Sequence, residues 1–311
     1  MADTERLTAP TLEQLAEAAE VNYVRTPFQR ELDSPARFRA FQRLGVEMAL
    51  VRRDGRMEAV AYLLPASLET PGGEAPGSRV EWVYMFQVAA RLEAPGAGAL
   101  LVRQVMKWYP AILGIGITPD AVRIYQAFKW THYRDIWRLV HPLRLDRMIE
   151  DYGGRLTKPW QRGVLGAMAG VYNFAGGAIE AALAAGVSCE AWKPSASDTK
   201  AAAVAEYLPL YRVGELIAAN VGGAGRIGNP PASGLGSLRQ HAALWRQMRR
   251  DGLKFCEMLI PTPELRERAK RLGYWPVSLP VWYWDKNQTM APVLEQLGSG
   301  KISFLETDKV V

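Results

Sequence analysis

The chain has 311 residues, of which 49% are hydrophobic and 23% are charged, and its net charge is +6 at pH 7. This composition is ordinary for a globular protein and excludes a disordered chain or a collagen-like fibre. The length fits two domains of about 150 residues each. The two cysteines have no CxxC spacing, which excludes a disulfide-stapled miniprotein and a structural zinc site of that kind.

Neither an export signal nor a membrane span is expected. The first residues, Met1 to Arg6, are polar and no apolar segment follows them, so we expect a cytoplasmic protein. The most apolar stretch, residues 163–187, contains Asn173 and Glu180 and consists mostly of Ala and Gly. We therefore expect a packed helix there rather than a transmembrane helix.

Hydrophobic periodicity predicts the elements of the first half. Asp54-Gly55, between two alternating apolar runs, indicates a hairpin turn, and Pro119 is typical of a helix start. The expected elements are helices at 11–21 and 34–44, strands at 46–51, 57–64 and 79–90, a helix at 99–109, a strand at 111–117, a helix at 120–130 and a closing strand at 136–140.

The second half is expected to begin with helices and then to alternate. The expected elements are helices at 160–185, 201–210, 238–250 and 264–272, strands at 253–260 and 277–284, and a glycine-rich loop at 221–236. Residues 223–228 of this loop match the letters of the dinucleotide fingerprint GxGxxG, but Pro230 and Pro231 forbid the helix that the fingerprint needs. The three histidines lack metal-ligand spacing, so no metal site is expected.

A short internal repeat indicates two related domains. Residues 118–130 begin Thr-Pro-Asp and end on Trp, and residues 262–274 begin Thr-Pro-Glu and end on Tyr, at a constant offset of 144. Each segment follows a Gly-x-Gly, a helix and a strand. We therefore expect a first domain at 1–145, a helical connection at 146–186 and a second domain at 187–311.

The first Gly-x-Gly is a natural anion site. Gly96-Ala97-Gly98 lies between an apolar strand and a helix, where backbone N–H groups point outward and the helix dipole favours a phosphate. A tight turn that needs small residues would show the same letters. The missing third glycine excludes a dinucleotide fingerprint, and the lack of GK[ST] excludes a Walker A loop.

Two runs in this region resemble the GCN5-related N-acetyltransferase (GNAT) family. The family's pyrophosphate loop reads V-x-x-x-x-Q/R-x-x-G-x-G/A, and residues 88–98 match its valine and both glycines, with Glu93 in place of Gln or Arg. The family's next helix often reads A-x-x-x-Y-x-x-x-G-F. Ala121 and Tyr125 match that pattern, while Lys129 and Trp130 replace the Gly-Phe pair.

The resemblance implies a fold and a co-substrate. The fold would be α/β (α+β), with two tandem GNAT-like domains whose mixed, mainly antiparallel sheets are flanked by helices. The co-substrate would be a coenzyme A thioester, either acetyl-CoA or a longer acyl-CoA. Pantetheine would bind a strand edge freed where two central strands separate, and the pyrophosphate would bind the loop. The residues implied are Phe86, Gln87, Val88, Arg91, Gly96, Ala97, Gly98 and Ala99.

The resemblance also implies catalytic residues. Tyr125 falls where the family protonates the departing thiolate, although a packed helix tyrosine is the alternative. Glu81 lies near the position of the family's base, one residue out of register, and a bulge in its strand would correct the register. A solvated strand residue, with water as the base, is the alternative for Glu81.

The second copy resembles a degenerate GNAT domain. Ala269 stands at the position of Tyr125, so this copy has no phenol to donate a proton. Tandem copies resemble sugar N-acyltransferases and Fem-type peptidyltransferases. The expected function is acyl transfer to a small amine, with a nucleotide-linked amino sugar as the first candidate. Trp282 and Trp284 are expected to stack a nucleobase or to lie in a sheet core.

Two alternatives stay open at this point. One is Fem-like aminoacyl transfer from charged tRNA, and the other is a non-catalytic binding protein, which Glu93 favours. We expect no DNA partner. The sequence does not indicate the oligomeric state.

Overall fold

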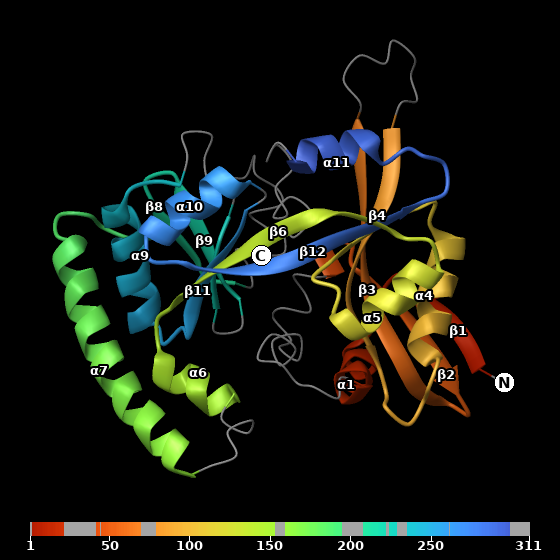
Figure 1. Ribbon diagram of the computed structural model, residues 1–311, viewed down its shortest axis with the longest axis horizontal. Coiled ribbons are helices and arrows are strands. Elements are labelled where there is room, and N and C mark those ends of the chain that lie inside the picture. Colours follow the sequence, from red (N-terminus) through yellow and green to blue (C-terminus); the bar gives the residue numbers. More distant parts are fainter. Residues whose placement is uncertain are drawn as a thin grey trace. The chain divides into compact units, whose positions relative to one another are not determined.

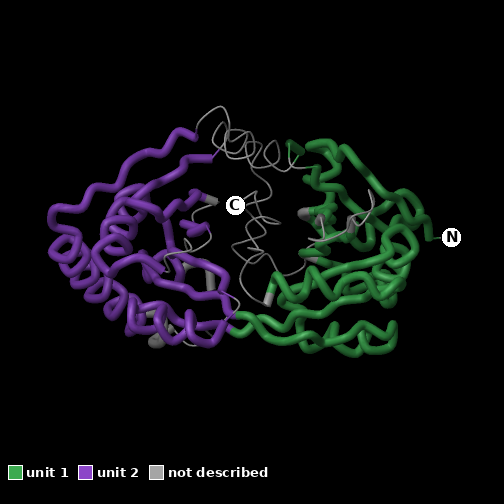
Figure 2. The backbone as a smooth tube through the Cα atoms, turned by 90° about the horizontal axis from the view of Figure 1, so that it is seen from above, with its two compact units in different colours: residues 1–25, 32–136, 278–310 green, residues 26–31, 137–277, 311 purple. Residues whose placement is uncertain are grey.

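The computed structural model divides into two compact units. It describes residues 2–21, 42–43, 45–69, 79–152, 159–194, 208–221, 224–228, 235–260 and 262–298. Of these residues, unit 1 holds those up to Ile136 and those from Ser278 onward, and unit 2 holds those from Trp137 to Val277 (Figure 2). The expected helix at 34–44 and most of the one at 201–210 lie outside the described residues.

Unit 1 is built on a mixed sheet with the strand order β1-β2-β3-β4-β5-β12 (Figure 1). Strands β1 to β4 are antiparallel, β5 is parallel to β4, and β12 is antiparallel to β5. The strands are β1 (Ala2–Leu7), β2 (Glu47–Arg53), β3 (Arg56–Glu69), β4 (Arg79–Ala90), β5 (Ala111–Ile115) and β12 (Trp275–Asp285). The helices are α1 (Leu12–Val21), α4 (Ala97–Trp108), α5 (Pro119–Ala127) and α11 (Ala291–Gly298).

The β2–β3 hairpin forms where the sequence predicts it. Asp54 has φ 51° and Gly55 has φ 80°, as a two-residue turn between right-twisted strands requires. Helix α4 then buries Leu101 and Val105 in a core that includes Val83 of β4 and Ile112 of β5. This packing holds the first turn of α4 next to the end of β4.

Unit 2 repeats the plan with the strand order β6-β11-β10-β9-β8-β7. Here β10 and β11 form the parallel pair, and the other neighbours are antiparallel. The strands are β6 (Thr131–Pro142), β7 (Glu190–Ala191), β8 (Leu210–Val213), β9 (Leu216–Val221), β10 (Ala224–Ile227) and β11 (Phe255–Ile260). The helices are α6 (Leu145–Tyr152), α7 (Pro159–Leu183), α9 (Leu238–Arg250) and α10 (Pro263–Arg271).

The internal repeat is present in three dimensions. Helix α10 has the bounds of α5 shifted by 144 residues. Trp130 N donates to Tyr125 O at 3.0 Å, and Tyr274 N donates to Ala269 O at 3.1 Å, so both helices end in the same way. Lys129 adopts the positive φ (61°) that glycine adopts at the matching position of unit 2. This shows how Lys129 can replace the family's usual glycine.

The two units exchange their last strands. Strand β6 follows α5 of unit 1, but its residues from Trp137 onward pair with β11 of unit 2. Strand β12 follows α10 of unit 2, but Val281 to Asp285 pair with β5 of unit 1. The strand expected at 136–140 therefore does not close the sheet of unit 1. The units consequently differ from the expected domains at 1–145 and 187–311.

The expected helical connection at 146–186 belongs to unit 2. Helix α7 packs along α9, where Glu180 accepts hydrogen bonds of 2.6 and 2.8 Å from Arg249. None of the helices that the structure describes is long and apolar enough to cross a membrane.

Part of the loop expected at 221–236 is a strand instead, β10, with Ala224 and Ile227 buried. The glycine-rich sequence of β10 does not indicate a strand, and its pairing with β9 and β11 stabilises it as one. A Cβ on Gly225 would lie 2.2 Å from Met248 Sδ of α9. This glycine of the apparent dinucleotide fingerprint therefore serves helix-on-strand packing.

Candidate functional site

Strands β4 and β5 of unit 1 separate at a defined point. Their parallel pairing runs from Val83–Ile112 to Met85–Gly114 and ends there. Beyond it, Phe86 to Ala90 keep only β3 as a neighbour among the described strands, while Ile115 of β5 pairs with β12. The parallel pairing of β4 and β5 thus ends at Met85, and a separation of two central strands is what the family resemblance implies.

A bulge accompanies this separation. Val60 of β3 pairs with Ala89 of β4, and Tyr62 of β3 pairs with Phe86 of β4. One residue of β3 therefore lies opposite two residues of β4, 87 and 88. Phe86 stacks with Tyr62 and Tyr84 at ring-centroid distances of 5.7 and 5.2 Å. Val88 is exposed. The side chain of Gln87 lies outside the described part of the chain.

The N-terminus of α4 is open to an anion. Gly96 is the N-cap with φ 87°, and no side chain caps this helix. Ala97 N bonds back to Ala94 O at 3.2 Å, whereas the N–H groups of Gly98 and Ala99 have no partner among the described residues. A Cβ on Gly98 would meet only Ala90 Cβ, at 3.5 Å. The protein's own packing therefore does not require glycine at 98, and the space can admit a ligand close to the backbone.

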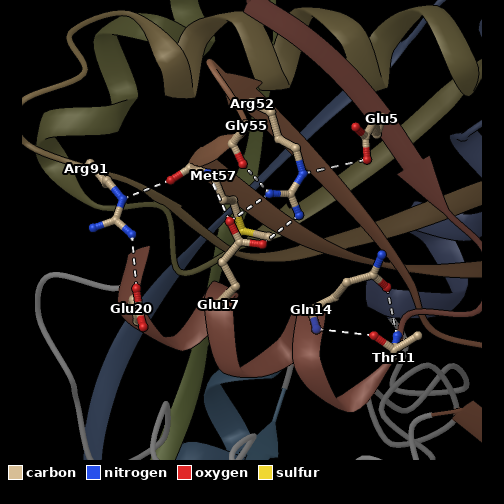
Figure 3. A network of polar contacts seen from close by, with 9 residues as sticks. All are labelled: Glu5, Thr11, Gln14, Glu17, Glu20, Arg52, Gly55, Met57 and Arg91. Atoms are coloured by element: carbon tan, nitrogen blue, oxygen red, sulfur yellow. Dashed lines mark hydrogen bonds and ion pairs between the residues drawn. The ribbon is translucent and has the colours of Figure 1, made fainter.

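Arg91 is bound within the protein. Its Nε donates to Met57 O at 2.8 Å and its Nη2 lies 3.5 Å from Glu20 of α1 (Figure 3). Only 13% of its side chain is exposed. Arg91 thus fastens the start of the loop to β3, and its guanidinium is not aimed at a phosphate as the sequence analysis had expected.

A different arginine stands beside the anomalous glutamate of the loop. Arg56, at the start of β3, donates to Glu93 at 2.9 Å, and both side chains are exposed. The backbone of Glu93 and the Arg56 charge hold the pKa of this carboxyl below its ordinary value. Sequence inspection missed Arg56 because it is separated from Glu93 by 37 residues. The fold thus places a cation beside the carboxylate of Glu93.

Tyr125 carries a largely buried phenol. The residue is 4% exposed, and its ring meets the edge of Trp130 at a centroid distance of 4.5 Å. Among the described residues no hydrogen-bond partner of its hydroxyl is found, and the buried Nε1 of Trp130 is also unpaired. Burial raises the pKa of Tyr125 well above its ordinary value, so the phenol keeps its proton at neutral pH.

Glu81 does not lie at the strand separation. It is exposed, pairs across to Ser67, and precedes Met85 by four residues, about 13 Å along the strand. The bulge expected to correct its register lies at 87–88, on the far side of Met85, and leaves Glu81 where it was. Nothing brings this carboxylate to the place where the strands part.

A histidine that the sequence analysis set aside is better placed. His132 Nε2 lies 3.0 Å from Asp135 Oδ1, and Ser278 Oγ donates to Asp135 Oδ2 at 2.6 Å. The His132 ring lies 5.2 Å from the ring of Trp282, whose strand partner Gly114 marks the separation point. The i,i+3 spacing on a strand gave no signal in the sequence. The carboxylate orients the imidazole in the way a general base requires.

The two tryptophans expected either to bind substrate or to lie in a sheet core differ in burial. Trp282 is 8% exposed and belongs to the apolar cluster that includes Val83 and Ile112, which favours the core role. Trp284 is half-buried and packs against the same cluster. No three His, Cys, Asp or Glu side chains of the described chain are grouped so as to hold a metal ion.

Among its described residues, unit 2 lacks the uncapped helix and the phenol of unit 1. The N-terminus of α9 is closed by a capping box, in which Ser237 and Gln240 bond each other's backbone N–H groups. In the core, Tyr274 places its hydroxyl 2.9 Å from His241 Nδ1 and accepts from Trp245 Nε1 at 3.0 Å. Ala269, at the position of Tyr125, is buried beside this network.

Comparisons with known proteins address the fold. No family model and no curated protein matches the sequence. This chain is similar in structure to a candidate acetyltransferase from Pyrococcus horikoshii, with a TM-score of 0.54 and 11% identity. The alignment covers 91% of this chain and 89% of the acetyltransferase. It is also similar to a tandem GNAT protein from the clavulanic acid biosynthesis pathway, with a TM-score of 0.51 and 12% identity. That alignment covers 92% of this chain and 99% of the tandem GNAT protein. The chain has a tandem GNAT fold.

At such low identity the likeness concerns the fold alone. It agrees with the fold class expected from the sequence, including the tandem arrangement. In the tandem GNAT fold of this chain, the separated parallel strands and the uncapped helix occur together only in unit 1 within the described residues.

Proposed function

We propose that the protein is an acyl-CoA-dependent N-acyltransferase in which unit 1 carries the reaction. The observation that supports this most is the conjunction in unit 1 of separated strands, an uncapped α4 and a buried phenol on α5. A GNAT fold supports acyl transfer in general. A coenzyme A thioester as co-substrate, acetyl-CoA or a longer acyl-CoA, is part of the proposal.

Unit 1 would bind the co-substrate in two places. The N–H groups of Gly98 and Ala99 would receive the pyrophosphate, assisted by the helix dipole and by Arg56. The edge of β4 at Gln87 and Val88, beyond its pairing with β5, would hydrogen-bond the pantetheine amides as an added strand does.

The residues at the separation point would handle protons. Tyr125, protonated at neutral pH, would donate to the departing thiolate. His132, oriented by Asp135, would take a proton from the attacking amine, either directly or through water. No covalent enzyme intermediate is required when the amine attacks the thioester directly.

The acceptor is proposed to be a small primary amine, and a nucleotide-linked amino sugar is the first to test. Its support is the tandem organisation alone, which is an analogy at the level of the fold. The burial of Trp282 leaves it little surface on which a nucleobase could stack, whereas Trp284 is half-buried. An acceptor panel should therefore include amino acids and polyamines as well.

Calorimetric titration with acetyl-CoA tests the binding step. We expect one CoA per chain, because Ser237 and Gln240 occupy the N-terminus of α9. A stoichiometry of two would contradict the assignment to unit 1. Thiol release with the amine panel tests turnover, and CoA binding without turnover on any amine would favour a non-catalytic protein. Native mass spectrometry that shows bound tRNA instead would favour the Fem-like alternative.

A further inference from the structure

Helix α7 of unit 2 presents its apolar side to solvent. Five of its large side chains are more than half exposed: Val164 (51%), Met168 (59%), Val171 (71%), Phe174 (82%) and Ile179 (58%). Figure 1 shows the helix lying along unit 2 beside α9. Such a contiguous apolar surface is uncommon on a monomeric protein and marks an interaction site.

The polar side chains that the structure describes in α7 point the other way. Asn173 binds Leu145 N at 2.9 Å and Asp146 at 2.6 Å, and the Tyr172 hydroxyl donates to Pro142 O at 3.1 Å. Glu180 is 3% exposed and paired with Arg249. The helix is thus polar toward its own unit and apolar toward solvent, the reverse of an ordinary surface helix. An arrangement of this kind needs a cover on the outer side.

The exposed side carries a seam with alternating spacings of four and three residues. Its members are Val164, Met168, Val171, Ala175, Ala178 and Ala182, all of them exposed. This is the repeat of a coiled-coil contact face, and it spans roughly 27 Å. The N-terminal half of the seam is large and the C-terminal half is small.

The division of the seam into a half with large side chains and a half with small side chains indicates which surface can pack against it. We propose that α7 pairs in antiparallel fashion with α7 of a second copy of this chain, about a two-fold axis at the level of residue 173. In this pairing Val171 meets Ala175 of the partner subunit, Met168 meets Ala178 of the partner subunit, and Val164 meets Ala182 of the partner subunit. Every large side chain then faces a small one, whereas a parallel pair would set large against large and leave voids between the alanines.

Charge and size agree with a second copy. From Gly163 to the end of α7 the only charged residue is Glu180, which is buried, so the net charge of +6 on each chain places no like charges across this contact. Phe174 and Ile179 flank the seam and enlarge the contact toward the ~800 Å² per partner of a specific interface.

Sedimentation equilibrium of the full chain tests the pairing. The wild type is expected at twice the chain mass, and Met168→Glu at 34.5 kDa. The side chain of Met168 is exposed, so the substitution leaves the fold of the monomer intact, which a thermal melt verifies. Trp275→Glu, at an equally exposed apolar residue on β12, is the control and should remain dimeric. A wild type that is still monomeric at about 100 µM, or a Met168→Glu variant that is still dimeric, would overturn the proposal.

Crosslinking tests the orientation. In a Cys189→Ser background, Val171→Cys and Ala175→Cys chains should form a disulfide when mixed, and Ala175→Cys alone should not. A crosslink of Ala175→Cys with itself would overturn the antiparallel pairing. Flotation of the wild type with phosphatidylcholine vesicles would identify a membrane as the cover instead.

Discussion

Tyr211 donates a hydrogen bond of 2.7 Å to Asp251 in unit 2. In unit 1, Glu47 stands at the position of Tyr211 and Tyr109 at the position of Asp251, and here Tyr109 is the donor. Glu47 lies in β2 and Tyr211 in β8, each the second strand from the outer edge of its sheet. Counted across the strands toward the parallel pair, Glu47 is in line with Leu63 and Met85, and Tyr211 is in line with Ala218 and Ile227. Asp251 and Tyr109 are the C-cap residues of α9 and α4. The repeat has kept the bond while exchanging the residues, so this fold requires the end of that helix to be fastened to that strand.

The surroundings of the two bonds differ. Glu47 is 8% exposed and receives two further hydrogen bonds from Arg6, at 2.7 and 2.9 Å. Asp251 is exposed, pairs with no Lys or Arg within the described residues, and lines an open cavity of about 700 Å³. Water can therefore replace a lost partner at Asp251 but not at Glu47.

Tyr109→Phe should therefore destabilise the protein more than Tyr211→Phe. Loss of the phenol beside buried Glu47 should lower the free energy of unfolding by about 1–3 kcal/mol, and loss of the phenol beside Asp251 by about 0.5–1.5 kcal/mol. Urea unfolding of the two variants at pH 7 measures both. Equal losses would show that the burial of Glu47 does not matter.

Stability should depend on pH through His241. Burial lowers the pKa of this imidazole from 6.5 to about 4, and its Nε2 bonds Leu235 O while its Nδ1 faces Tyr274. Since the unfolded chain binds the proton more tightly, the stabilisation is complete above pH 6.5 and is lost as the pH falls from 6.5 toward 4. The loss is on the order of 3 kcal/mol. Urea unfolding at pH 7 and pH 4.5 should show a smaller difference for His241→Gln than for the wild type, and identical differences would contradict the prediction.

Tyr125→Phe should lower kcat by about 10- to 1000-fold, because the variant keeps the ring and removes the general acid. The hydroxyl has no partner among the described residues, so the melting temperature and CoA affinity should change little. Steady-state kinetics and thermal melts of the two proteins measure these quantities. Wild-type kcat would remove Tyr125 from the mechanism and leave positioning to explain catalysis.

Gly98→Asp should abolish CoA binding, because it sets a carboxylate against the pyrophosphate at the N-terminus of α4. Gly98→Ala is the matched control, since its Cβ fits 3.5 Å from Ala90 Cβ without adding charge. Calorimetry with acetyl-CoA should rank wild type and Gly98→Ala well above Gly98→Asp. If all three bind equally, the pyrophosphate does not lie at α4.

His132→Gln should lower kcat, because a glutamine cannot accept the proton. Asp135→Asn should have a smaller effect of the same kind, since it disturbs only the orientation of the ring. KM for acetyl-CoA should stay within about twofold in both variants. A wild-type kcat in His132→Gln would return the role of base to water.

The sequence alone was sufficient for features with a local cause. Asp54-Gly55 predicted the hairpin because few residue pairs adopt two positive φ angles. The offset of 144 predicted two related units, and the helix bounds repeat at that offset. The candidate site in unit 1 is a prediction from local letters as well, because a strand, a glycine turn and a helix start lie within one short run.

Only the tertiary structure decided which strand pairs with which, and which side chain stands beside which. The exchange of β6 and β12 has no local signature, since a strand's hydrogen bonds are satisfied equally by any neighbour of suitable register. Strands β7 to β10 also have no local signature, because they are too short to show an alternating pattern of apolar and polar residues. Arg56 reaches Glu93, and Trp282 is buried, for one physical reason: both depend on the packing of segments distant in the chain, which sequence periodicity does not encode.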